Sequence, residues 1–234
     1  MSAFDYDNSF DDDWEERNEL EWGEGDWQKY LKKQDEEVQR FLSVYDKLAP
    51  SPDRIDEAAR LMGWEAPPQQ DSALQTGQVS TPLTFSSEED SEDSDDALPP
   101  YTVHQHPVYI VTQAFHQYLS LKWEIHCSKS ATPITPAIAW KFAQSLGSWE
   151  RHCLLGLQAL DMGDFALTIC HFKHTLLNFN HTLSLISLLP DTKDVEFNNF
   201  IQSCKIRLFD LREVWLRVIN DCREEIRRQL ENRD

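Results

Sequence analysis

Histidines gather in one stretch of the chain in a pattern that could bind a metal ion. His171, His174, Asn178 and His181 follow one another at spacings of three, four and three residues. These spacings place the four side chains along one strip if the stretch is an α-helix. Imidazole nitrogens at such spacing are suitable ligands for zinc, copper or iron between facing helices. His171, His174 and His181 are therefore the candidate metal ligands.

The same strip has an alternative interpretation without an ion. His116, His126, Glu150 and His152 lie in neighbouring helical patterns and could add donors. A carboxylate-bridged two-metal bundle would need Glu-x-x-His pairs on two helices, and the sequence contains no such pair. A solvated helix face normally carries Lys and Glu, whereas this one carries imidazole, amide and hydroxyl groups. A polar core network, or a surface that meets solvent or a partner, is the competing hypothesis.

The sequence contains no pattern for covalent or nucleotide chemistry. Cys170 and His171 are neighbours, and neighbours on a helix point about 100° apart, so they do not form a nucleophile–base pair. GxSxG, HExxH and phosphate-binding glycine loops do not occur, and the whole chain has only 7 glycines from which to build loops. We expect a protein that is not an enzyme and uses no cofactor.

Acidic residues are concentrated in the first part of the chain. The 234 residues carry a formal net charge of −19. Residues 1–100 hold 8 Lys and Arg against 27 Asp and Glu, whereas residues 101–234 hold 14 of each. Sequence-independent binding to nucleic acids or anionic membranes needs clustered Lys and Arg. We therefore expect neither nucleic acid nor membrane as a partner, and basic proteins remain possible partners.

Cysteine usage and hydropathy indicate the compartment. The five cysteines are an odd number without a CxxC pair, and each lies in an apolar helical pattern, where Cys behaves as a small hydrophobe. This usage is typical of a reducing compartment. The N-terminus lacks an apolar signal core, and no stretch reaches the ~18 uninterrupted apolar residues of a membrane span. We expect a soluble cytoplasmic protein.

Residues 1–65 form an acidic segment interleaved with aromatic side chains. Aromatic residues dominate the energetics of short docking segments, which makes Trp14, Trp22 and Trp27 the candidate anchors for a protein partner. The same side chains could instead pack on their own domain, and composition does not separate the two hypotheses. Tight binding of basic proteins by this segment, as a mimic of nucleic acid, is a third hypothesis.

Apolar spacing predicts two helices within that segment. The first runs from Asp26 to Leu48, with Trp27, Leu31, Val38, Phe41, Tyr45 and Leu48 on one side. The second is short: Ser51 is its expected N-cap, Pro52 lies in its first turn and Gly63 ends it. Residues 66–100 follow, with five prolines and a block of acids and serines, and this composition predicts a disordered linker.

Residues 101–234 show four long helical patterns. The expected bounds are 107–127, 136–162, 165–189 and 193–231. Thr135 and Pro136 form a cap and first-turn pair. Gly163 is the expected left-handed end of one helix, and Asp164 is the expected cap of the next. Links this short make successive helices antiparallel.

The third of these helices, 165–189, is the centre of the predicted bundle. It contains one formal charge, Lys173, in a chain in which 27% of residues are charged. Residues at alternating spacings of four and three define its core side: Phe165, Ile169, Phe172, Leu176, Phe179, Leu183 and Ile186. Leucines flank this stripe on one side and threonines on the other. A helix with so little charge around it usually has neighbours on more than one side.

Two stretches resemble fragments of known motifs without completing them. Residues 55–64 look like the first helix of a helix-turn-helix reader, but prolines and glutamines follow where a recognition helix should begin. Residues 160–165 resemble the turn inside a tetratricopeptide unit, and a solenoid needs several stacked copies.

These patterns predict an all-α protein with an antiparallel up-down four-helix bundle at 101–234, a smaller acidic helical segment at 1–65 and a disordered linker at 66–100. The expected function is that of an intracellular, non-enzymatic interaction or scaffold protein, whose partner is another protein or a second copy of the chain. The alternative is a bundle that binds a metal ion or small ligand through His171, His174 and His181.

Overall fold

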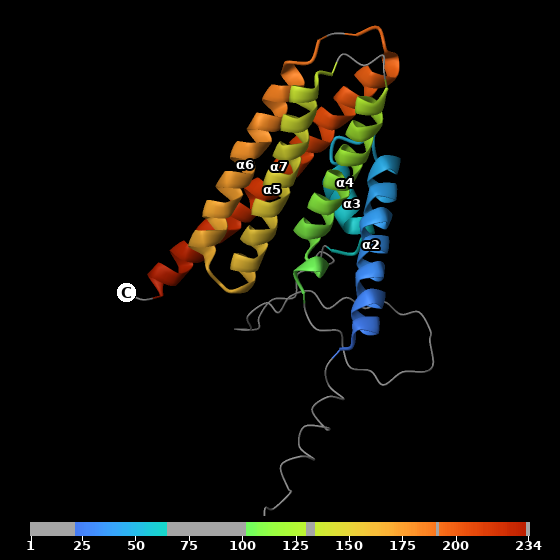
Figure 1. The fold of residues 1–234 in the computed structure, drawn as a ribbon. Coiled ribbons are helices and arrows are strands. Elements are labelled where there is room, and N and C mark those ends of the chain that lie inside the picture. Colours follow the sequence, from blue (N-terminus) through green and yellow to red (C-terminus); the bar gives the residue numbers. More distant parts are fainter. Residues whose placement is uncertain (1–21, 65–101, 130–133, 191, 233–234) are drawn as a thin grey trace, which may run out of the picture. The chain divides into compact units, whose positions relative to one another are not determined.

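The structure is a computed structural model, and the residues that it describes are 22–64, 102–129, 134–190 and 192–232. Every regular element among them is a helix, and no strand occurs in these ranges (Figure 1). The prediction of an all-α protein is confirmed for this part of the chain. The described residues up to 37 and those from 38 onward form two compact units. The predicted segments 1–65, 66–100 and 101–234 remain a prediction, because residues 65–101 lie outside the described part.

The described helices occur close to the predicted ranges. In chain order they are α2 (Glu24–Lys47), α3 (Arg54–Leu61), the short 3-10 helix η1 (Val103–Gln105), α4 (Pro107–Ser128), α5 (Pro136–Asp161), α6 (Phe165–Ser187) and α7 (Val195–Glu231). Helix α2 begins at Glu24, two residues before the predicted start, and α7 begins at Val195, two residues after it. The start of α3 also differs from the prediction. Ser51 does not cap α3, because its hydroxyl accepts from the backbone N–H of Asp53 at 3.3 Å, and Asp53 occupies the N-cap position.

Capping residues set the ends of the other helices as their types predict. The Thr135 hydroxyl accepts from the N–H of Ile138, and Pro136 begins α5. The Asp164 carboxylate accepts from the N–H of Leu167 at 2.9 Å and so caps α6. Gly163 has a φ of 75°, the left-handed conformation that ends α5 at low steric cost.

Helices α4 to α7 enclose one core. Helix α5 packs against α4 and α6, and α7 packs against α4 and α6. The fully buried large side chains include Phe115, Phe142, Trp149, Phe172, Phe179 and Trp215. Helices α5 and α6 approach closely at Gly156, where an added Cβ would lie 2.9 Å from the Phe172 ring. The small residue is therefore required by the packing of this pair.

The last two turns of α4 bury aromatic rings and expose an aliphatic side chain. Ile125 is 39% exposed, whereas Trp123 and His126 are buried. The Trp123 ring stacks on Phe142 at a centroid distance of 4.0 Å, and His126 stacks on Phe200 at 4.7 Å. Stacking on aromatic rings of α5 and α7 therefore decides which side of α4 is buried at this end.

The second half of α2 and helix α3 belong to the same compact unit as α4 to α7. Val38, Phe41 and Tyr45 are buried, and the Phe41 ring lies 5.7 Å from that of Phe115. The predicted apolar side of α2 is thus a core face only from Val38 onward. Trp27 and Leu31, on its first turns, are 38% and 45% exposed.

Candidate functional site

Helix α6 exposes a line of uncharged side chains on the side opposite the core. We call this line the α6 outer stripe, and its members are Leu167, Cys170, His174, Leu177, His181, Ser184 and Leu188, all of them exposed. Its three leucines are 41%, 65% and 67% exposed, in chain order. The seven members follow one another at spacings of three and four residues, which keeps them on one side of the helix.

The rotation of α6 is fixed by the opposite side of the helix. Phe172 and Phe179 are fully buried, which confirms the predicted core stripe. The threonine flank is also buried: the hydroxyls of Thr168, Thr175 and Thr182 each donate to the backbone carbonyl four residues earlier. Helices α5 and α7 are neighbours of α6, as its low charge predicted. The leucine flank is divided: Leu185 is buried, whereas Leu167, Leu177 and Leu188 are exposed.

The α6 outer stripe differs in charge from an ordinary solvated face. Helix α6 contains no carboxylate, and Lys173 is its one formal charge. The exposed side of α7, in contrast, carries charged residues along its length, including Arg212, Glu213, Arg223 and Glu224. Exposed patches of apolar side chains usually mark an interaction surface.

Three imidazoles meet beside the stripe, and one of them comes from α5. The His152 Nδ1 lies 3.5 Å from the His171 Nδ1, and the His152 ring stacks on His174 with centroids 5.1 Å apart. Burial, and then the neighbouring His174 and His171, lower the pKa of His152. His152 is therefore neutral at pH 7, the form that can accept a hydrogen bond or bind a metal. The spacing within α6 predicted that His171 and His174 lie together. His152 was one of several possible additional donors, and the packing of α5 on α6 selected it.

His181, the third predicted metal ligand, is exposed on α6, and no contact joins it to the other described histidines. Among the described residues, no group of three or more His, Cys, Asp or Glu side chains is arranged to hold a metal ion. The packing thus brings together His152, His171 and His174 instead of the predicted set His171, His174 and His181.

The predicted aromatic anchors lie in the first compact unit. Trp14 lies outside the described residues. Trp22 and Trp27 have ring centroids 5.0 Å apart, and both contact the ring of Tyr30 edge-on, at 5.5 and 5.8 Å. The two tryptophans therefore form one aromatic cluster with the buried Tyr30.

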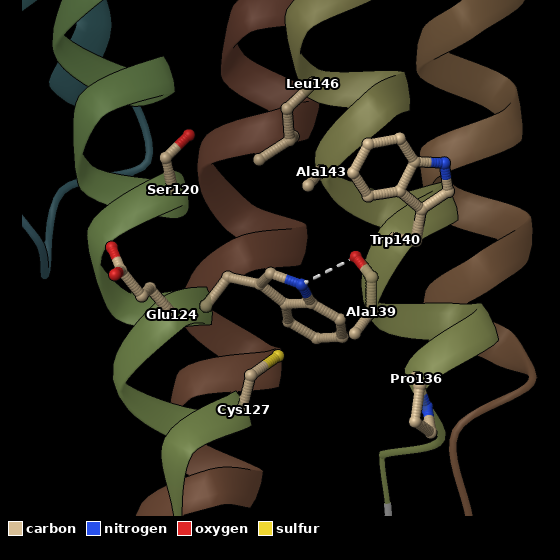
Figure 2. Close-up of a pocket in the computed structure, with 9 residues that line it drawn as sticks. Ser120, Glu124, Cys127, Pro136, Ala139, Trp140, Ala143 and Leu146 are labelled. Atoms are coloured by element: carbon tan, nitrogen blue, oxygen red, sulfur yellow. Dashed lines mark hydrogen bonds between the residues drawn. The ribbon is translucent and has the colours of Figure 1, made fainter.

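A pocket that the sequence did not indicate lies between α4 and the start of α5 (Figure 2). Its volume is about 490 Å³, and its lining residues are Ser120, Trp123, Glu124, Cys127, Pro136, Ala139, Trp140, Ala143 and Leu146. The Trp123 indole N–H donates to the carbonyl of Ala139 at 3.2 Å, and this bond ties the two helices together. In Figure 2 the Glu124 carboxylate points away from α5. The pocket thus presents mainly apolar surface.

The thiols of Cys127 and Cys153 are not activated as nucleophiles. Burial raises the pKa of the Cys127 thiol in the pocket and raises that of Cys153 to about 12. Both thiols are thus protonated and weakly nucleophilic at neutral pH.

His116 contacts Glu150 at 3.5 Å, and the other Glu150 oxygen accepts from Gln113 at 2.7 Å. This polar group crosses from α4 to α5 and ties the two helices.

A charged network that sequence periodicity missed joins residues 45–56 to α7. Arg54 donates to both oxygens of Asp210, at 2.6 and 3.0 Å, and the Tyr45 hydroxyl bonds to the same carboxylate. Burial and the bond to Asp210 raise the pKa of Tyr45, which therefore stays protonated. Two further ion pairs, Asp46–Arg207 and Asp56–Arg217, continue the network. The network joins the two segments structurally, because each charged side chain in it is paired with one of opposite sign.

The described helices include none with the length and apolar character needed to cross a membrane.

Comparison with known proteins adds no family to this description. No protein-family model, no curated protein and no solved structure matches the chain.

Proposed function

We propose that this chain is a non-enzymatic interaction protein that binds another protein chain through the α6 outer stripe. One observation carries the proposal: a helix whose opposite side is packed in the core presents seven exposed uncharged side chains, with Lys173 beside them as the one exposed charge of α6. Complete burial of a fully exposed leucine is worth roughly 1.5–3 kcal/mol, and these three leucines, which are 41%, 65% and 67% exposed, forgo part of that. A partner that covers the stripe would recover part of that free energy.

The scaffold that we propose for this surface is an antiparallel up-down four-helix bundle of α4 to α7. Two features support the proposal. The turn between α5 and α6 spans only residues 162–164, which favours antiparallel neighbours. Each of the four helices also packs against the helix before it or after it in the chain. Such a frame would hold α6 rigid and leave its outer side available.

The acidic N-terminal region is proposed as a second docking element. The cluster of Trp22, Trp27 and Tyr30 supports this proposal, because Trp27 remains 38% exposed beside two other aromatic rings. Aromatic anchors of this kind contribute strongly to protein interfaces.

The test of the proposed function introduces a glutamate on the stripe in one variant and a glutamate on α4 in a control variant. Leu177→Glu places a carboxylate at a position that is 65% exposed, and Leu121→Glu on α4 is its matched control at 59% exposure. Full-length wild type and both variants are used as bait in the native host, and the bound proteins, including untagged copies of the chain, are quantified by mass spectrometry. We expect Leu177→Glu alone to lose bound protein by at least tenfold, with an unchanged far-UV spectrum and unfolding midpoint. An identical set of bound proteins for all three baits contradicts the proposal.

A second candidate function is the binding of a transition-metal ion, which the 3.5 Å separation of the His152 and His171 Nδ1 atoms favours. Two nitrogen ligands at about 2.0–2.1 Å from a tetrahedral ion lie about 3.4 Å apart. The test is calorimetric titration of the untagged protein with Zn²⁺. Binding that His152→Ala removes and His181→Ala leaves intact supports this function, and equal heats for the wild type and His152→Ala contradict it.

A further inference from the structure

The α6 outer stripe is close to a palindrome. Its residues, read from the N-terminal end, are Leu, Cys, His, Leu, His, Ser, Leu. Read from the other end, the order is the same except that the small residues Cys170 and Ser184 change places. Leu177 lies at the centre, and three residues lie on each side of it. This order has a direct consequence for pairing with a second copy.

A two-fold axis makes each residue of an interface contact its symmetry-related position. If two α6 helices lie antiparallel with the axis at Leu177, positions whose numbers add to about 354 or 355 face each other. Leu177 then meets Leu177 of the second copy, Leu167 meets Leu188, and His174 meets His181. Cys170 meets Ser184. Every layer therefore pairs like with like: leucine with leucine, imidazole with imidazole, and a small side chain with a small one.

Among the possible contacts between two copies, one through the α6 outer stripe avoids placing acidic side chains against each other. The chain carries a net charge of −19, so two copies repel each other at most orientations. Helix α6 has no carboxylate, and contact through its outer side brings no two acids together. An uncharged stripe also lacks the charges by which an interface usually selects a different, oppositely charged partner.

We propose that two copies of this chain associate through their α6 outer stripes in an antiparallel, two-fold symmetric pair. This inference rests on the proposed function and names the partner. The stripe runs over 22 residues, which corresponds to about 32 Å of helix about 10 Å wide. Leu155 on α5 is 38% exposed and lies one turn from His152, beside the stripe. The covered area is smaller than the ~800 Å² per partner of a standard interface, so we expect a dissociation constant on the order of 10 μM.

Sedimentation velocity of the purified full-length chain tests the association. We expect the wild type to shift from monomer to dimer between about 1 and 100 μM. Leu177→Glu faces its own copy across the axis and is expected to weaken the dimer at least a hundredfold. The control Leu121→Glu is expected to associate as the wild type does. A wild type that stays monomeric at 100 μM overturns the inference, as does equal association of Leu177→Glu.

Disulfide trapping tests the antiparallel order. In a background in which Cys127 is replaced by serine, Cys170 is the one exposed cysteine among the described residues. With a mild oxidant that takes up the thiol hydrogens, Ser184→Cys is expected to give a covalent dimer, because Cys170 then faces the new cysteine. Ser187→Cys, exposed on α6 outside the stripe, is the matched control and is expected to remain uncrosslinked. Rapid crosslinking of the background itself through Cys170 would indicate a parallel pair and overturn the proposed geometry.

The two proposals fail differently. If the purified chain is monomeric but Leu177→Glu still loses bound proteins in the host, the self-association is wrong and the interaction function stands. If Leu177→Glu changes neither property, both are wrong.

Discussion

Gly156 shows how one side chain sets the distance between two helices. A Cβ at this position would lie 2.9 and 3.0 Å from ring carbons of Phe172 and 3.3 Å from the His171 Cβ. The ring of Phe172 is fully buried and has no free space to move into. The glycine thus allows α5 to approach α6 closely enough for His152 to reach His171 and His174.

The first prediction compares two glycines of the same helix. Gly156→Ala is expected to lower the free energy of unfolding by about 1–2 kcal/mol, because overpacking exceeds the gain in helix propensity. Gly147→Ala has nothing within 4 Å of the added Cβ and is expected to raise it by about 0.5–1 kcal/mol. Urea unfolding followed by circular dichroism measures both. Equal stability of Gly156→Ala and the wild type would show that Phe172 can move.

At the scale of elements, residues 46–56 are held on α7 by ion pairs in addition to apolar contacts. The Arg54 and Asp210 side chains are 16% and 15% exposed, so water screens this pair only in part. Arg54 also donates to the carbonyl of Ser51 at 3.1 Å, which fixes the turn before α3. Apolar burial of Phe41, Tyr45 and Met62 supplies the attraction, and the ion pairs select the orientation.

The second prediction removes the shared acceptor of this network. Asp210→Asn leaves the Arg54 guanidinium without its carboxylate and is expected to lower the free energy of unfolding by roughly 2–4 kcal/mol. Glu213→Gln, an exposed neighbour on α7, is the control and is expected to change it by less than about 0.5 kcal/mol. Urea midpoints at neutral pH provide the measurement. If both variants unfold at the wild-type midpoint, the pair contributes nothing to stability.

At the scale of the whole molecule, buried histidines make the stability of the fold dependent on pH. Burial is the main cause that lowers the pKa of five histidines: His104, His106, His116, His126 and His152. The unfolded chain takes up protons at these side chains near pH 6.5, before the folded chain does. Below that pH the unfolded state binds more protons, so acid favours unfolding.

The third prediction is that acid lowers the stability of the fold, because the unfolded chain binds more protons than the folded chain. The free energy of unfolding is expected to be highest above about pH 7 and to fall as the pH decreases from about 6.5 toward the lowered pKa values of the folded state. Each such histidine contributes at most about 1.4 kcal/mol per pH unit within that interval. Urea midpoints between pH 7.5 and 5.0 measure the slope. His126→Phe, which keeps a ring between Phe197 and Phe200, is expected to reduce it. A midpoint independent of pH over this range would contradict the assignment.

Local rules explain why so much of the helical pattern was predictable. Pro136 can begin a helix but not continue one, Gly163 tolerates a positive φ, and Asp164 caps through its own carboxylate. These effects act within a few residues of the chain. The 3.6-residue period likewise placed the core side of α6 correctly, because burial of Phe172 and Phe179 requires only that some neighbour covers them.

The sequence by itself determined which stretches are helical, where several of them end and which side of α6 is buried, because those properties depend on contacts along one helix. The tertiary structure decided that His152 meets His171 and His174, that Ile125 is exposed while His126 is buried, and that Arg54 finds Asp210. It also decided that Leu167, Leu177 and Leu188 of α6 lie outside while Leu185 is buried. These outcomes depend on how far one helix is rotated and shifted against another, and the period of a single helix carries no information about its neighbour.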